Sequence, residues 1–255
     1  MFSPHLPRAA LVTGAARRVG RAIALDLAEA GFAVAVHYSH SEAEAVAVAA
    51  EITAGGGRAV TLAADLAQEG DTASLVNRAT AALGPVGVLV NNASTFERDD
   101  ALGATRASWD LHMEVNLRAP FVLTQAFARA LPAGAEGVVV NMLDQRVWSL
   151  SPHFTSYTLS KAGLWTLTQT LALALAPHIR VVGIGPGPAL PSRRQTQAQF
   201  DAQAEALPLR RGTTPEEICR TVRMLLASPS LTGQMIALDG GQHLCWGPGV
   251  EMPEE

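Results

Sequence analysis

The sequence has little charge, few cysteines and no clustered metal ligands. Charged residues make up 16% of the 255 and the net charge is −4, which argues against a nucleic acid as the main partner. The two cysteines, Cys219 and Cys245, are too few for a disulfide framework. They also lack the spacing of metal ligands, so no metal site is expected.

Membrane and export signals are missing as well. The apolar stretch Leu164–Ala176 is too short for a membrane span and is interrupted by threonine and glutamine. Residues Met1–Arg8 do not show the pattern of a signal peptide. We therefore expect a cytoplasmic protein with no membrane partner, a description that fits an enzyme and many non-enzymes alike.

What the chain does have is a regular alternation of short apolar runs with helical stretches. Hydrophobic residues make up 48% of the sequence, enough for one compact α/β domain over residues 1–255. The alternation predicts βαβ units around a parallel sheet of about seven strands. The expected strands are Ala9–Thr13, Ala33–His37, Ala59–Ala63, Val86–Asn91, Gly137–Met142, Ile179–Ile184 and Met235–Leu238. The expected helices are Val19–Ala30, Ser41–Ala54, Asp71–Leu83, Arg106–Ala130, Thr155–Ala176 and Pro215–Ala227.

Two places interrupt this alternation. Pro120 predicts a kink or a break within the helix Arg106–Ala130. Residues 186–209 are rich in proline, arginine and glutamine, and are expected to form a mobile loop with a short helix. In an open α/β sheet such an insertion commonly covers the ligand crevice.

A glycine-containing turn follows the first strand and opens the first helix. It runs from Thr13 to Gly20, and this context favours a Rossmann-type dinucleotide site. Gly14 permits a tight turn, and Gly20 permits close packing of the helix. The backbone can then approach a pyrophosphate at the helix N-terminus. A plain strand-to-helix turn is the alternative, since Arg18 stands where a further glycine is usual.

The end of the second strand indicates which dinucleotide binds. It reads His37-Tyr38-Ser39-His40-Ser41 and contains no acid to accept from the ribose hydroxyls of NAD. Hydroxyl and imidazole groups can donate to a 2′-phosphate, and Arg18 adds positive charge, so NADPH is the expected cofactor. A cap on the next helix is the other role open to Ser39 and Ser41. Asp65 and Leu66, then Asn92, Ala93 and Ser94, follow two further strands and are expected to line the same crevice.

Tyr157 and Lys161 lie one helical turn apart. A nearby ammonium stabilises the phenolate, which makes Tyr157 a candidate proton donor or acceptor near neutral pH. Asp144 follows the strand Gly137–Met142 and is expected near the same edge of the sheet. Taken alone, the pair is equally consistent with a surface Y-x-x-x-K on an ordinary helix.

Taken together, these motifs resemble the short-chain dehydrogenase/reductase family over nearly the whole chain. The family would assign proton transfer to Tyr157 and the nicotinamide ribose to Lys161. Asn116 would anchor a water that connects Lys161 to solvent. Pro186-Gly187 and Asp239-Gly240-Gly241 also fit the pattern. The fourth position of the tetrad is normally a serine, and here it is Asp144.

That departure, with Arg18 in place of glycine and the run Asn91–Phe96, resembles the pteridine reductase subgroup. In that subgroup the residue matching Arg18 reaches the cofactor phosphates and the pterin, and the aromatic matching Phe96 stacks on the pterin ring. The resemblance implies a catalytic set of Asp144, Tyr157, Lys161 and Asn116. It implies cofactor contacts from Gly14, Arg18, Val19, Gly20, His37, Tyr38, Ser39, His40, Ser41, Asp65, Leu66, Asn92, Ala93, Ser94, Tyr157, Lys161, Pro186 and Gly187. The expected substrate contacts are Arg18, Ser94, Phe96, Asp144, Tyr157 and Trp148.

The expected activity is NADPH-dependent hydride transfer to a C=N bond of dihydrobiopterin, dihydromonapterin or dihydrofolate. A carbonyl reductase acting on a ketone or acyl thioester is the alternative, and a non-catalytic dinucleotide sensor is a further one. Family members usually assemble through the helices matching Arg106–Ala130 and Thr155–Ala176, so a homotetramer is expected. Several residues have no assigned role, namely Arg146, His153, Phe154, Arg193, Arg194 and the tail 242–255. A solvated basic pair is the favoured interpretation of Arg193 and Arg194, and a surface position that of His153.

Overall fold

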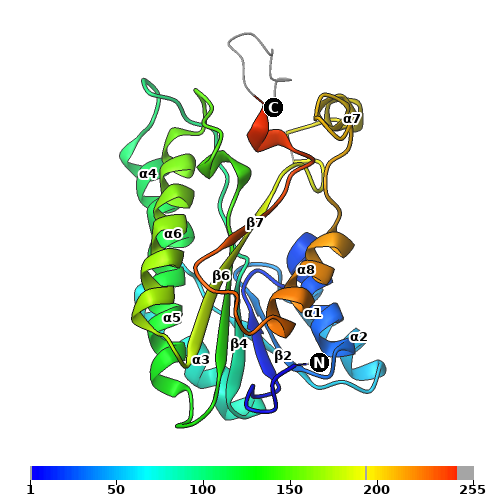
Figure 1. The fold of residues 1–255 in the computed structure, drawn as a ribbon, viewed down its shortest axis with the longest axis vertical. Helices are drawn as coiled ribbons and strands as arrows, with labels where there is room; N and C mark the ends of the chain where they lie inside the picture. Colours follow the sequence, from blue (N-terminus) through cyan, green and yellow to red (C-terminus); the bar gives the residue numbers. More distant parts are fainter. Residues whose placement is uncertain (1, 193, 246–255) are drawn as a thin grey trace.

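A parallel sheet of seven strands lies at the centre of the computed structural model, which describes residues 2–192 and 194–245 (Figure 1). The strands follow the order β3-β2-β1-β4-β5-β6-β7. They are β1 (Ala9–Val12), β2 (Ala33–Tyr38), β3 (Ala59–Ala63), β4 (Val86–Asn91), β5 (Gly137–Met142), β6 (Ile179–Pro186) and β7 (Met235–Leu238). Every predicted strand is present, and only the carboxyl ends of β1, β2 and β6 differ, by one or two residues.

Helices cover both faces of the sheet, as Figure 1 shows. One face holds α1 (Arg18–Glu29), α2 (Glu42–Ala54) and α8 (Pro215–Ala227), and the other holds α3 (Glu69–Leu83), α5 (Ala119–Ala130) and α6 (Thr155–Ala174). Alternate residues of one strand serve the two cores: Val34 and Val36 pack with α1, and Ala35 packs with α3. The doubly wound α/β fold expected from the sequence is therefore confirmed.

The predicted helix Arg106–Ala130 is divided in the structure. It consists of α4 (Arg106–Met113), a wide π-helical turn η1 (Glu114–Arg118), and α5, which has Pro120 in its first turn. Proline suits that position because the first N–H groups of a helix have no partner within it. The predicted interruption is confirmed, and it places Asn116 in the wide turn. Such turns are often found at functional sites.

The strand order reverses between β1 and β4, which defines the switch point of the sheet. Asn91 of β4 is in register with Asn141 of β5, so these two strands end level with each other. The residues that follow β1, β4, β5 and β6 therefore meet at one edge. Ligands of open α/β sheets bind at this edge.

The segment after β6 lies across that edge. It includes α7 (Gln197–Glu205), which begins at a reciprocal capping box between Thr196 and Gln199. The predicted short helix is thus present. Arg193 lies outside the described residues, as do residues 246–255 of the tail. None of the helices in the described ranges is long and apolar enough to cross a membrane.

Candidate active site

A cleft of about 730 Å³ lies at the switch point, lined by the segments after β1, β2, β3 and β4. It brings together most of the residues assigned to the cofactor. These are Gly14, Arg18, Val19, Gly20, His37, Tyr38, Ser39, His40, Ser41, Asp65, Leu66, Asn92, Ala93 and Ser94. The N-terminus of α1 lines the cleft. The first N–H groups of a helix have no partner within it, so this end suits a pyrophosphate.

The turn at the start of α1 is too tight for side chains at two positions. A Cβ built on Gly20 meets the Gly14 carbonyl oxygen at 2.2 Å, and Gly14 itself has a φ of +61°. The Asn92 side chain donates to the Thr13 carbonyl at 2.8 Å, which fixes the turn against the end of β4. A turn without side chains lets the backbone approach the pyrophosphate of a dinucleotide closely, so these residues fit the expected cofactor.

His37 has a different role from the one expected. Its Nδ1 accepts from the backbone N–H of Gly14 at 3.0 Å, and its Nε2 lies 3.2 Å from the Ala64 carbonyl. Nε2 must therefore bear the hydrogen, and both ring nitrogens are used. Burial lowers the pKa of His37 to about 4. The expectation that this imidazole donates to a phosphate is wrong because it is buried, neutral and committed to the backbone. His37 instead stabilises the turn at Gly14 by accepting its backbone hydrogen bond.

The groups at the end of β2 that remain for a 2′-phosphate are Tyr38, Ser39, His40 and Ser41, which all line the cleft. Ser41 stands at the N-cap of α2, yet its side chain makes no capping hydrogen bond. A cap is thus not the role that the structure gives this hydroxyl. With no acid at the end of β2, these groups are consistent with NADPH.

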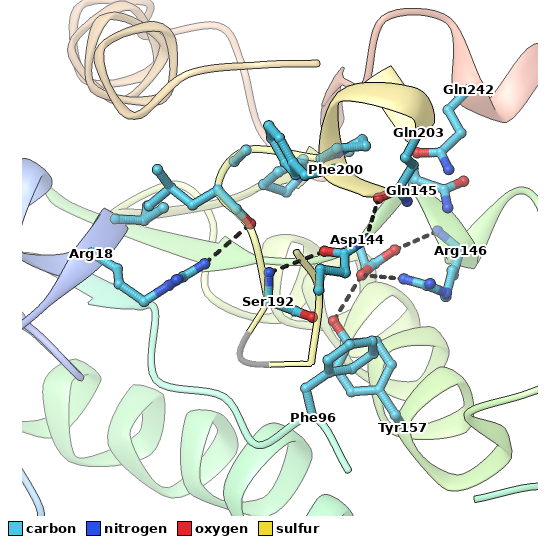
Figure 2. Close-up of a pocket in the computed structure, with 17 residues that line it drawn as sticks. Arg18, Phe96, Asp144, Gln145, Arg146, Tyr157, Ser192, Phe200, Gln203 and Gln242 are labelled. Atoms are coloured by element: carbon cyan, nitrogen blue, oxygen red, sulfur yellow. Dashed lines mark hydrogen bonds and ion pairs between the residues drawn. The ribbon is translucent and has the colours of Figure 1, made fainter. Parts of the chain in front are cut away.

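A second cavity of about 230 Å³ adjoins the cleft and shares Arg18 and Val19 with it. The Tyr157 hydroxyl donates to Asp144 Oδ2 at 2.8 Å inside this cavity (Figure 2). The Arg146 guanidinium lies 3.4 Å from the same carboxylate oxygen. The predicted convergence of Asp144 and Tyr157 is therefore present. Pro186 and Gly187 line the same cavity.

Lys161 lies buried beneath Tyr157. Its ammonium donates to the Met142 carbonyl at 2.8 Å and lies 5.8 Å from the centre of the Tyr157 ring. Burial lowers the pKa of Lys161 to about 8, against the opposing effect of the Asp144 charge. The Asn116 side chain bonds to protein groups on both sides, accepting from the Thr95 N–H at 2.8 Å and donating to Ser160 Oγ at 3.1 Å. Asn116 thereby fixes the β4 loop against α6.

This pKa predicts a pH-dependent affinity for NADPH. The lysine of the cofactor-free chain loses its proton as the pH rises through about 8. We expect the Kd for NADPH to be constant below that pH and to rise by up to about tenfold per unit above it. Fluorescence titration from pH 6.5 to 9.5 measures this dependence. Lys161→Met should bind more weakly with a flat profile, and an equally flat profile in the parent chain would contradict the prediction.

Phe96 lies at the cavity but is not open on both faces. Its ring stacks on Phe154 with centroids 4.3 Å apart, and Tyr157 meets it edge-on at 4.7 Å. Phe154 precedes α6 in a left-handed conformation, with φ of 60°, a strain often stored at functional sites. A flat substrate can therefore stack on one face of Phe96 only, because Phe154 takes the other.

Arg18 and Arg194 connect the segment after β6 to the rest of the site. The Arg18 guanidinium donates to the carbonyls of Pro191 and Leu190, at 2.9 and 3.2 Å. Arg194 donates to the Phe96 carbonyl at 2.7 Å and to the Glu97 carboxylate at 3.2 Å. The view of Arg194 as a solvated cation is therefore wrong, since it binds the covering segment to the Phe96 loop.

Arg18 adopts a φ of 52°, the left-handed region that suits glycine. A glycine at this position would relieve the backbone strain of the folded chain. That gain should offset the greater conformational entropy that glycine gives the unfolded chain. We expect Arg18→Gly to leave the melting temperature nearly unchanged, while the Kd for NADPH rises about tenfold through loss of a charge-assisted contact. Melting and fluorescence titration test this expectation. Arg21→Ala, which removes an exposed ion pair of the same helix with Glu51, is the control; an equal loss of affinity there would contradict it.

Two expected substrate residues do not line the second cavity. Ser94 lines the adjoining cleft instead, and Trp148 lines neither of the two. The Trp148 side chain is exposed and packs edge-on against Trp165 and His243. The 3₁₀ turn η2 (Gln145–Val147) directs the chain away from the cavity before Trp148 is reached. His153 is exposed, as favoured, and forms an isolated bridge with Asp100.

Other residues of the site carried no signal in the sequence. The cavity wall includes Gln145, Gln203 and Gln242, which come from three separate elements. A buried chain of hydrogen bonds also lies beside Tyr157, whose ring meets that of His112 edge-on at 5.9 Å. His112 Nδ1 lies 2.6 Å from Ser156 Oγ, and Ser156 in turn donates to Asp99. Only the folded chain brings these residues together.

A Rossmann sheet with a nucleotide cleft beside a Tyr–Lys–Asp site defines a dinucleotide-dependent oxidoreductase. The sequence model of the short chain dehydrogenase family matches residues 8–201. The chain therefore belongs to that family, and the predicted membership is confirmed.

Two solved structures are similar over most of this chain. FolM alternative dihydrofolate reductase 1 from Brucella canis, complexed with NADP, is 49% identical with a TM-score of 0.93, covering 98% of this chain and 100% of that one. The protein of the same name from Brucella suis, also with NADP, is 51% identical with a TM-score of 0.91, covering 94% and 96%. The 3-oxoacyl-[acyl-carrier-protein] reductase of Synechocystis sp. is 32% identical over 91% of this chain and 95% of its own length.

Proposed function

We propose that the chain is an NADPH-dependent reductase that transfers hydride to a C=N bond of a pterin or dihydropterin. The observation that carries this proposal is the Tyr157–Asp144 hydrogen bond in a cavity adjoining the nucleotide cleft. The two Brucella relatives support it, since they are named dihydrofolate reductases and bind NADP. Dihydrobiopterin, dihydromonapterin and dihydrofolate are the candidate substrates.

The chain's own residues supply geometry and protons for this reaction. Bound NADPH supplies the hydride. Reduction of C=N also needs a proton at nitrogen, and the Tyr157 hydroxyl is the donor within reach of the cavity. Asp144 accepts from that hydroxyl and so orients it. Lys161 would hold the nicotinamide ribose, and Phe96 offers the substrate ring one aromatic face.

The segment of residues 186–209 is proposed to cover the substrate. It lines the cavity through Pro188, Ser192, Phe200 and Gln203. Its hydrogen bonds to Arg18 and Phe96 hold it over the site. Release and return of these contacts would admit and enclose the substrate.

The direct test is the loss of NADPH absorbance with two panels of substrates. One panel holds the three dihydropterins, and the other holds ketones, aldehydes and a 3-oxoacyl thioester. Turnover of the dihydropterins is expected. Turnover of carbonyl compounds alone would reject the proposal in favour of the carbonyl reductase, which the Synechocystis relative supports. Tight NADPH binding without turnover on either panel would favour the sensor.

We also infer a homo-oligomer, with a tetramer as the expected state. Trp109 of α4, and Leu159 and Leu173 of α6, are large apolar side chains at the surface. Figure 1 shows α4, α5 and α6 together on one side of the sheet. Light scattering coupled to size exclusion measures the assembly, and a monomer at micromolar concentration would contradict it.

A further inference from the structure

The side of the cavity away from Phe96 and Tyr157 is built of carboxamides. Figure 2 shows Gln145, Gln203 and Gln242 gathered there, opposite the two aromatic rings. All three are buried although they are polar. They come from η2, α7 and the turn η3 (Gln242–Leu244), so no single local motif produces the group.

Gln145 stands out among the three. The residue is 2% exposed, and its Oε1 has no hydrogen-bond partner within the described part of the chain. The backbone around it is fixed, because Asp144 Oδ1 accepts from the Arg146 N–H at 2.8 Å and the Gln145 carbonyl accepts from Trp148. A buried acceptor left without a donor is costly. Gln145 therefore lines the cavity wall with a buried carbonyl oxygen that lacks a donor.

We infer that Gln145 is a specificity-determining residue that accepts a hydrogen bond from a hydroxyl on the substrate's side chain, an inference that rests on the proposed function. The carbon of the C=N bond reduced in a 7,8-dihydropterin carries that side chain, so its first hydroxyl lies close to the reacting nitrogen. Gln145 lines the same cavity as Asp144 and Tyr157, so its side chain is available to that hydroxyl. A carbonyl oxygen attracts a hydroxyl donor and repels a carboxylate, so the wall suits a neutral hydroxylated group.

Two substrates that differ in one hydroxyl test the inference. They are 6-hydroxymethyl-7,8-dihydropterin and 6-methyl-7,8-dihydropterin. The parent chain should prefer the hydroxymethyl compound in kcat/KM. Gln145→Leu should lower kcat/KM for that compound about tenfold, chiefly through KM, and leave the methyl compound nearly unchanged. The preference then disappears.

Further variants separate recognition from folding. Gln145→Glu keeps an acceptor and should keep the preference, whereas Gln145→Met fills the same volume without an acceptor and should lose it even if the leucine variant folds poorly. Gln197→Leu, an exposed glutamine of α7 that bonds only to Asp201 among the described contacts, should change neither substrate.

The possible failures can be told apart. An equal loss on both compounds in Gln145→Leu and Gln145→Met would overturn the assignment while the proposed function stands. Turnover of neither compound by the parent chain would overturn the assignment, and it would overturn the proposed function as well where dihydrobiopterin, dihydromonapterin and dihydrofolate are also not reduced. Retention of the preference in both apolar variants would also overturn the assignment.

Discussion

Replacement of Tyr157 by phenylalanine is expected to lower kcat by about 10²–10⁴-fold, the usual contribution of a positioned proton donor. The ring still fits beside Phe96, which it meets edge-on at 4.7 Å. Only the hydroxyl bonded to Asp144 is lost. Because hydride delivery then lacks its proton source at the substrate nitrogen, the effect falls on the chemical step. Single-turnover oxidation of NADPH measures that step directly.

Affinity and stability are the controls for this variant. The Kd for NADPH should change little, since Tyr157 does not line the nucleotide cleft. Thr158→Val is the matched control on the same helix. Its hydroxyl is buried and has no partner within residues 2–192 and 194–245, so its removal should leave kcat intact. A Tyr157→Phe variant that retains full kcat would contradict the assigned role.

The fold could be predicted from the sequence because each element is marked locally. The strands are buried on both faces and so read as continuous apolar runs, as in Val86–Asn91. The helix predicted over Pro215–Ala227 is present as α8, and a capping box between Thr214 and Glu217 fixes its start. Asp144 could be placed near the site in advance because it follows β5, whose carboxyl end lies at the edge where ligands bind.

Several roles in the site depend on partners that are distant in sequence. His37 was a candidate phosphate donor until the fold placed it under Gly14, 23 residues away. Arg194 donates to the carbonyl of Phe96, 98 residues away. The residues next to Arg194 in the sequence therefore gave no indication of this contact. Trp148 is turned outward by a single 3₁₀ turn, a detail too local for hydrophobic patterning to resolve.

Replacement of Asp144 by serine distinguishes the proposed reductase from the carbonyl reductase. A ketone reductase normally has serine at this position, so that activity should be kept or raised. Loss of the carboxylate oxygen that faces Tyr157 should instead lower kcat/KM for a dihydropterin by about 10²-fold, because the phenol loses the acceptor that orients it. Parallel assays with a dihydropterin and a ketone measure the two effects in one variant.

The serine substitution is specific because Asp144 has two separable functions. Oδ1 caps the turn η2 by accepting from the Arg146 N–H at 2.8 Å, and Oδ2 accepts from Tyr157. Serine is a good N-cap residue, so the cap is kept, while the contacts of Oδ2 with the Tyr157 hydroxyl and the Arg146 guanidinium are removed. Asp100→Ser makes the same change at an exposed turn, where Asp100 accepts from Leu102 at 2.9 Å, and should leave both activities unchanged. Full dihydropterin turnover by Asp144→Ser would show that a hydroxyl suffices at this position, and the carboxylate would then have no part in the proton transfer.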